Sequence, residues 1–182
     1  APKCQTAFGS GPGSGVIAAI LAKRGISNII ATDTNPKAIA CATANLKRLG
    51  LNKAVNIQSI DLFPKSCADL IVCNPPWLPA KPTSAIETAL YDPNHAMLTA
   101  FLNGVRHHLN PNGEAWLIIS DLAEHLHLRD KDFLQQCFQT ASLNVVDILK
   151  TKPQHKKAID ESDPLAFARN KETTYLYRLK AI

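Results

Sequence analysis

Short apolar runs alternate with longer stretches of helical periodicity along this chain, and this alternation limits its fold more than any other feature. The runs that we expect to form strands are residues 5–8, 28–32, 54–60, 68–73, 114–120, 143–149 and 173–179. Between the second and third runs, Ile39, Ala42 and Leu46 recur at the spacing of one helix face. Strands that alternate with helices form a parallel sheet with helices on both faces. We therefore predict an α/β fold.

Length and composition indicate one globular domain over residues 1–182, because 182 residues with 46% apolar side chains can bury one sizeable core. No apolar run approaches the roughly 20 residues that a membrane-spanning helix needs, and the first residues lack the pattern of a signal peptide. We expect a cytoplasmic domain without a membrane partner. Few residues precede the first glycines, which is compatible with a catalytic part of a longer protein whose N-terminal region is absent.

The cysteines and the charge say less about function. Five cysteines at irregular spacing predict reduced thiols, and no paired motif indicates zinc, so we predict no metal site. The net charge of +5 favours an anionic partner such as RNA, although many proteins that bind no nucleic acid share it.

A glycine-rich turn follows the first expected strand and leads into a helix. Gly9, Gly11, Gly13 and Gly15 let the backbone pass close to a ligand and direct the helix N-terminus at it. Asp33 lies about 20 residues beyond Gly13, the distance of an acid that binds the ribose of a nucleotide cofactor. We predict that these glycines and Asp33 bind a cofactor.

Two acids in this region each have an alternative role. Asp33 suits the N-cap of the following helix as well as a ribose. Asp61 follows the third expected strand, where its carboxylate can receive an adenine amino group or simply open a loop. We count both as candidate cofactor-binding residues.

The tetrapeptide Asn74, Pro75, Pro76, Trp77 follows directly on the wholly apolar strand 68–73. With this motif the sequence resembles class I S-adenosylmethionine-dependent methyltransferases that carry [DNS]PP[YFW] after the fourth strand, a group that methylates adenine amines and glutamine amides. The resemblance implies a Rossmann-like, seven-stranded, mostly parallel sheet with the last strand antiparallel. It also implies S-adenosyl-L-methionine as the cofactor. The acceptor is then a base amine of ribosomal RNA or a glutamine amide of a translation protein.

The chemistry of the motif explains its residues. A planar nitrogen has a delocalised lone pair, and it becomes nucleophilic when the Asn74 side-chain oxygen and the Pro75 carbonyl accept its N–H groups. Pro76 stiffens the turn, and Trp77 offers a flat face for stacking. We expect these four residues to be catalytic and Asn74 to border the cofactor as well. The alternative is a structural turn capped by a buried tryptophan.

Two other functions stay open. The family usually has an acid two positions before the first glycine of GxGxG, and Gly9 stands there. A catalytically silent adenosine-binding or RNA-binding module fits that change. An NAD-dependent oxidoreductase fits the glycines and Asp33 but not the Asn74–Trp77 motif.

The loop over residues 78–94 is expected to cover the acceptor. A basic cluster before the last expected strand contacts either solvent or RNA phosphates; it consists of Lys150, Lys152, His155, Lys156 and Lys157.

Overall fold

The computed structural model describes residues 4–11, 13–80, 90–153 and 166–182. The strands are β1 (Thr6–Ser10), β2 (Asn28–Thr32), β3 (Val55–Gln58), β4 (Ala68–Cys73), β5 (Leu109–Ser120), β6 (Leu143–Thr151) and β7 (Thr174–Ala181). The α-helices are α1 (Val16–Lys23), α2 (Pro36–Arg48), α3 (Ala96–Val105), α4 (Leu122–His125), α5 (Phe133–Thr140) and α6 (Ala166–Arg169). Short 3₁₀ turns at η2 (Pro93–His95) and η3 (Arg106–His108) flank α3.

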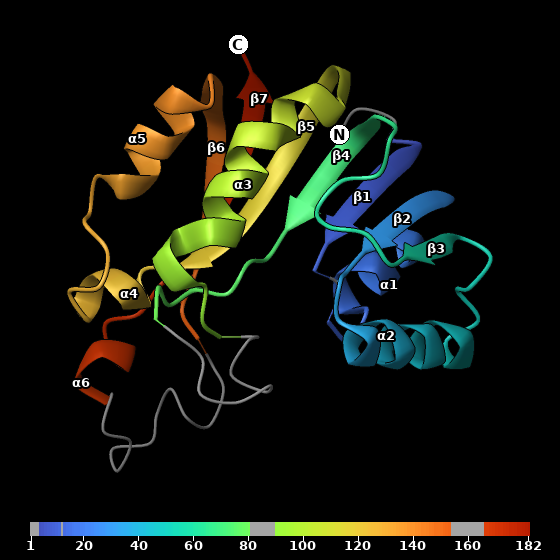
Figure 1. Cartoon of the computed structure of the whole chain (residues 1–182), viewed down its shortest axis with the longest axis horizontal. Helices are drawn as coiled ribbons and strands as arrows, with labels where there is room; N and C mark the ends of the chain where they lie inside the picture. The colour runs from blue at the N-terminus through green and yellow to red at the C-terminus, as the bar shows by residue number, and fades with distance from the viewer. Residues whose placement is uncertain (1–3, 12, 81–89, 154–165) are drawn as a thin grey trace.

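The strands form one seven-stranded sheet in the order β3-β2-β1-β4-β5-β7-β6 (Figure 1). The pairs along β3, β2, β1, β4 and β5 are parallel, and β7 runs antiparallel to both of its neighbours, β5 and β6. The predicted mostly parallel sheet with an antiparallel last strand is therefore confirmed. In such a sheet the carboxyl ends of β1, β2 and β4 meet at one edge, where open α/β sheets bind their ligands.

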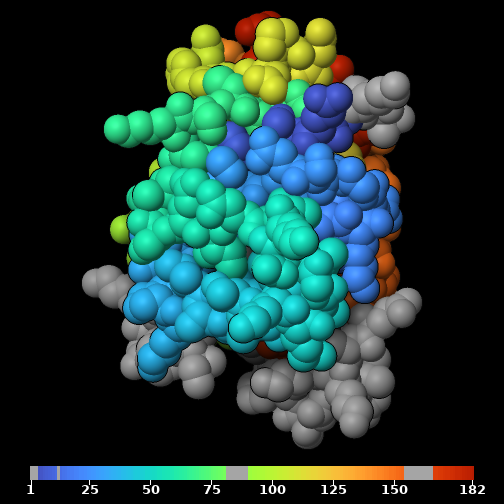
Figure 2. Space-filling view, turned by 90° about the vertical axis from the view of Figure 1, so that its right-hand side faces the viewer, coloured from blue at the N-terminus to red at the C-terminus, as the bar shows by residue number. Residues whose placement is uncertain are grey.

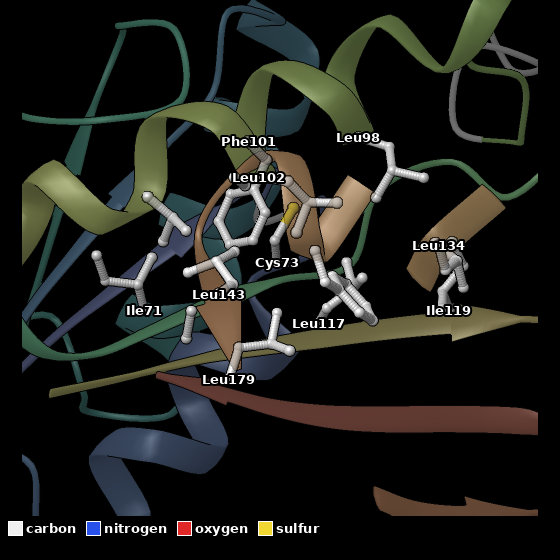
Figure 3. Packing of buried hydrophobic residues seen from close by; sticks show 14 of the residues in the cluster. Ile71, Cys73, Leu98, Phe101, Leu102, Leu117, Ile119, Leu134, Leu143 and Leu179 are labelled. Atoms are coloured by element: carbon white, nitrogen blue, oxygen red, sulfur yellow. The ribbon is translucent and has the colours of Figure 1, made fainter. Parts of the chain in front are cut away.

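The two faces of the sheet bury separate apolar clusters, because side chains alternate along each strand. Phe8, Ile71 and Leu117 face α3 and α5, where Phe101 and Leu134 complete the cluster (Figure 3). Ala7, Leu70 and Val72 face the opposite way. There α1 and α2 contribute the buried residues Ala18, Ala19, Leu21 and Leu46. Helices thus pack on both faces, as the alternating pattern predicts.

Beyond the sheet, α2 and the chain around β3 form one continuous surface at the β3 end of the molecule (Figure 2). Within the described ranges, none of the helices is long and apolar enough to cross a membrane.

Residues 110–113, Asn-Pro-Asn-Gly, have the composition of a turn but lie inside a strand. Helix α3 ends at Val105, and β5 already begins at Leu109, which pairs with Ala68. The next register pair is Leu70 with Glu114, so the intervening residues bulge out of the ladder. Asn112 takes a positive φ of 66° in this bulge. The turn-forming residues therefore produce a bulge within β5 and not a turn that precedes it.

Asp69 ties the start of β4 to its two neighbouring strands. Its Oδ2 accepts from the backbone N–H groups of Gln5 and Thr6 at 2.8 and 3.0 Å, and its Oδ1 accepts from Asn110 Nδ2 at 2.8 Å. These bonds, with that of Asn110 first, lower the pKa of Asp69 to about 2. The carboxylate thereby stabilises the register of β1, β4 and β5.

Candidate cofactor and acceptor site

The glycine loop lies between β1 and α1 at the carboxyl edge of the sheet. Gly11, Gly13 and Gly15 have φ angles of 69°, 53° and 84°, which side chains strongly disfavour. The Gly11 N–H donates to the Thr32 carbonyl over 2.9 Å, and this bond places the loop beside the end of β2. Asn45 of α2 donates through Nδ2 to the Ser14 carbonyl over 3.0 Å. The loop is therefore held from two sides, by β2 and by α2.

Leu62 fastens the segment after β3 to the same edge. Its carbonyl accepts hydrogen bonds from the hydroxyls of Ser10 and Thr32 at 2.9 and 2.6 Å. These two residues are the last of β1 and β2. Leu62 itself has a φ of 46°, an uncommon conformation for a branched side chain. The neighbouring Asp61 is exposed. The Leu62 contacts therefore hold Asp61 near the ends of β1 and β2, and its contact with a cofactor base stays a prediction.

Asp33 follows β2 at this edge but does not cap α2. Its Oδ1 accepts from the Asn35 N–H over 2.8 Å, while Asn35 Oδ1 accepts from the Lys37 N–H over 2.9 Å and is the N-cap. The alternative of Asp33 as the helix cap is wrong, because Asn35 stands directly before the first helical residue. The half-buried Asp33 carboxylate thus shapes the turn before α2 through Oδ1, and its predicted ribose contact stays a prediction.

The Asn74–Trp77 motif leaves β4 at the carboxyl edge with one internal hydrogen bond. Trp77 Nε1 donates to Asn74 Oδ1 over 3.0 Å. Because an indole N–H is only a donor, this bond fixes which end of the Asn74 amide faces Trp77. Asn74 is exposed, Pro75 is buried, and Pro76 and Trp77 are half-buried. The motif therefore presents an amide oxygen and an indole ring together at the surface.

Asp92, which sequence reasoning missed, joins this motif to α3. Its backbone N–H donates to the Leu78 carbonyl over 2.8 Å, and its buried carboxylate accepts from the N–H groups of Met97 and Leu98 at 2.9 and 3.0 Å. Met97 Cε in turn lies only 3.2 Å from where a Cβ on Gly11 would stand. Asp92 thus connects the residue after the Asn74–Trp77 motif to the start of α3, whose Met97 lies close to Gly11. An aspartate before a proline at a helix start was the available signal.

Part of the predicted acceptor loop is described. Leu78 N–H donates to the Leu90 carbonyl over 3.0 Å, and Leu78 pairs with Tyr91 in a short parallel bridge. These contacts close the base of the loop beside Trp77. Residues 81–89 of the predicted loop lie outside the described residues.

Gly9, the position where the family usually has an acid, is buried at the end of β1. A Cβ built there meets no heavy atom within 4 Å, and its φ is not in the left-handed region. A side chain at this position would therefore find room. Cys73, directly before Asn74, is fully buried, and burial raises the pKa of its thiol, so it stays an unreactive core residue.

The basic cluster before the last strand has two described lysines with contacts inside the protein. Lys150 Nζ lies 5.5 Å from the centroid of the Tyr175 ring. Lys152 Nζ donates to the carbonyls of Lys171 and Glu172 at 2.8 and 3.0 Å. His155, Lys156 and Lys157 lie outside the described residues. Within the described ranges there is also no group of three or more potential metal ligands.

The sheet order, the glycine loop and the motif after β4 define a domain of the S-adenosylmethionine-dependent methyltransferase class. The model of the methyltransferase small domain family matches residues 4–150, and the chain belongs to that family. The release factor glutamine methyltransferase of Cereibacter sphaeroides is 33% identical in an alignment of 128 residues that covers 63% of this chain and 46% of that protein. The tRNA1(Val) (adenine(37)-N6)-methyltransferase of Cytophaga hutchinsonii is 30% identical over 60% of this chain and 49% of its own length. The chain thus spans about half the length of these relatives.

Solved structures share the fold at low sequence identity. The ribosomal protein L11 methylase of Lactobacillus delbrueckii subsp. bulgaricus has a TM-score of 0.66 at 18% identity, and the match covers 100% of this chain and 72% of that one. A methyltransferase of Thiobacillus denitrificans, solved in complex with S-adenosyl-L-homocysteine, has a TM-score of 0.65 at 15% identity over 98% of this chain and 85% of its own. Both confirm the Rossmann-like architecture.

Proposed function

We propose that this domain transfers a methyl group from S-adenosyl-L-methionine to a planar nitrogen, either the side-chain amide of a glutamine in a translation protein or the exocyclic amine of an RNA base. The single observation that carries the proposal is the exposed Asn74 oxygen, held by Trp77 at the carboxyl end of the central strand β4. Two of the relatives, which are named for glutamine and for adenine N6 methylation, act on nitrogens of this kind.

The residues at the carboxyl edge fit the cofactor. Three glycines with positive φ leave the backbone bare for close approach, and Asp33 and Asp61 stand beside them with carboxylate oxygens for a ribose and an adenine amine. The bound cofactor supplies an electrophilic methyl group on a sulfonium. The protein must then provide only binding, orientation and the exclusion of water.

The motif prepares the acceptor nitrogen. A carbonyl oxygen has two lone pairs, so Asn74 Oδ1 can accept one N–H from Trp77 and a second from the acceptor. The Pro75 carbonyl accepts the other acceptor N–H, and both bonds strengthen as the nitrogen leaves its plane. Trp77 stacks on the flat amide or base, which adds roughly 1–3 kcal/mol of binding for a base. No general base is needed, because the proton leaves after transfer.

Two rival functions account for less of the site. An oxidoreductase that uses NAD gives no role to the exposed Asn74 amide and its indole partner. A silent binding module is consistent with Gly9 but leaves the same amide without a purpose. Calorimetric titration with S-adenosyl-L-homocysteine and with NAD tests the oxidoreductase alternative. We expect S-adenosyl-L-homocysteine to bind and NAD not to bind.

Single-turnover methyl transfer with labelled cofactor tests the proposal on total ribosomal and transfer RNA and, separately, on ribosomal and release-factor proteins. Asn74→Ala should lower turnover about 10²- to 10³-fold, the scale of losing one transition-state hydrogen bond, with almost normal S-adenosyl-L-homocysteine binding. Asn74→Asp should keep part of the activity, because a carboxylate still accepts an N–H. Asn144→Ala, an exposed asparagine on β6, is the matched control. Wild-type turnover by Asn74→Ala would reduce the motif to a structural turn.

A further inference from the structure

A cavity that shares no lining residue with the glycine loop or the Asn74–Trp77 motif lies on the α5 side of the sheet. It has a volume of about 250 Å³ and is lined by β5, β7 and β6 below and by α5 and the segment before it above. We call it the Arg129 cavity, after the charged residue that is most deeply buried in its wall. The lining residues used below are Glu124, Arg129, Lys131, Gln135, Tyr175 and Tyr177.

Arg129 is 6% exposed, yet only one of its three nitrogens is engaged. Nη2 donates to the Ser120 carbonyl and lies 3.4 Å from Glu124 Oε1. Nε and Nη1 are buried and have no hydrogen-bond partner among the described residues. Buried donors without partners are rare in proteins, because their lost hydration is not replaced, and they indicate a missing water, ion or ligand.

The charge of this side chain points to the nature of the missing partner. Burial lowers the pKa of Arg129, since a desolvated guanidinium is disfavoured. Glu124 and, more weakly, Tyr177 and Asp121 offset this only in part. The Glu124 contact is long, and burial raises the pKa of its own carboxyl group. An added negative charge would stabilise the guanidinium, and guanidinium groups bind carboxylate and phosphate oxygens in particular.

The remaining lining residues fit an anionic group on a planar molecule. Lys131 and Gln135 add a cation and an amide from the exposed side of α5 and the turn before it. Tyr175 and Tyr177 of β7 stack with ring centroids 5.7 Å apart and form an aromatic part of the cavity wall. Lys150, above the Tyr175 ring, adds a third positive charge to the neighbourhood. A wall that combines cationic donors with aromatic rings is suited to a planar molecule with one charged end.

We propose that the Arg129 cavity is a binding site for an oxyanion, a carboxylate or phosphate group on a small planar molecule, with Arg129 and Lys131 as its cationic ligands. The site shares no residue with the cofactor loop or the acceptor motif. The proposal goes beyond the proposed function and holds whether or not the domain transfers methyl groups to nitrogen.

The test follows the Arg129 Nε–H signal by nuclear magnetic resonance in the ¹⁵N-labelled protein. Sodium benzoate and inorganic phosphate are the anionic probes, and benzyl alcohol is an uncharged molecule of similar shape to benzoate. We expect a saturable shift of the Nε–H signal with benzoate, phosphate or both, and none with benzyl alcohol. The two anionic arms also show which oxyanion the site prefers.

A charge reversal at the mouth of the cavity avoids disturbing the buried network. Lys131→Glu should weaken the anion affinity by about tenfold or more, because the attraction between residue 131 and the bound anion becomes a repulsion. Lys53→Glu, an exposed lysine in the turn between α2 and β3, changes the net charge equally and should leave the affinity unchanged. No saturable shift with either anion would mean that the cavity holds water only. An equal response to benzyl alcohol, or an equal loss in both variants, would also overturn the proposal.

Discussion

Trp77 donates its indole N–H to the side-chain oxygen of Asn74 over 3.0 Å, so the fourth residue after the end of β4 orients the first. An exposed asparagine would otherwise rotate freely and lose entropy on meeting an acceptor. The bond to Trp77 orders the Asn74 side chain before an acceptor binds. It leaves one lone pair of Oδ1, which accepts the substrate N–H in the proposed mechanism. Trp77 therefore has two separable properties, a flat face and a hydrogen-bond donor.

Trp77→Phe separates these two properties, because phenylalanine keeps an aromatic face and lacks the N–H. We expect turnover to fall about fivefold, the rate equivalent of one neutral hydrogen bond of about 1 kcal/mol. Affinity for S-adenosyl-L-homocysteine should not change. Trp116→Phe is the control, since it also loses an indole bond, to Glu114 Oε2 at 2.9 Å, away from the motif. Equal turnover in both variants would show that the indole donor has no part in catalysis.

Asp33→Ala tests the ribose role by calorimetry. We expect S-adenosyl-L-homocysteine to bind about 1.5–3 kcal/mol more weakly, the scale of hydrogen bonds to a charged group. Asn35→Ala removes the true N-cap of α2 and should cost about 1 kcal/mol of stability without a comparable loss of affinity. If the two variants lose stability alike and neither loses affinity, Asp33 only shapes the turn.

The sequence predicted the elements and the motif positions well, because both depend on local patterns. The apolar run of β4 and the prolines after it place Asn74 at the carboxyl edge without further information. Contacts between distant segments were not predictable in this way. Nothing near Asp92 announces its contact with Leu78, and nothing near Arg129 announces the Ser120 carbonyl that it reaches. That Asn35 and not Asp33 caps α2 was also found only in the structure, since both side-chain types can cap a helix.

Asp69 should make stability depend on acid. Its pKa is about 2 in the folded protein and close to 3.8 in the unfolded chain, so the folded form binds fewer protons. A lowered folded pKa stabilises the protein above about pH 4, and this contribution disappears as the pH falls from about 4 to about 2. Asp69→Asn should therefore be less stable at pH 7 and converge on the wild type at low pH. Chemical denaturation at pH 7, 4 and 3 measures the difference, and a gap that does not narrow would contradict the assignment.

Gly9→Asp should strengthen cofactor binding. The strand geometry at Gly9 suits any residue, and a Cβ there meets no heavy atom within 4 Å. A carboxylate at this position restores the acid of related methyltransferases and gives the amino group of the methionine end a charged acceptor. Since a hydrogen bond to a charged group contributes about 1.5–3 kcal/mol, we expect S-adenosyl-L-homocysteine affinity to rise by at least about tenfold. Gly9→Ala controls for the added Cβ and should bind like the wild type. If Gly9→Asp binds no more tightly than Gly9→Ala, the methionine end does not reach β1 in this domain.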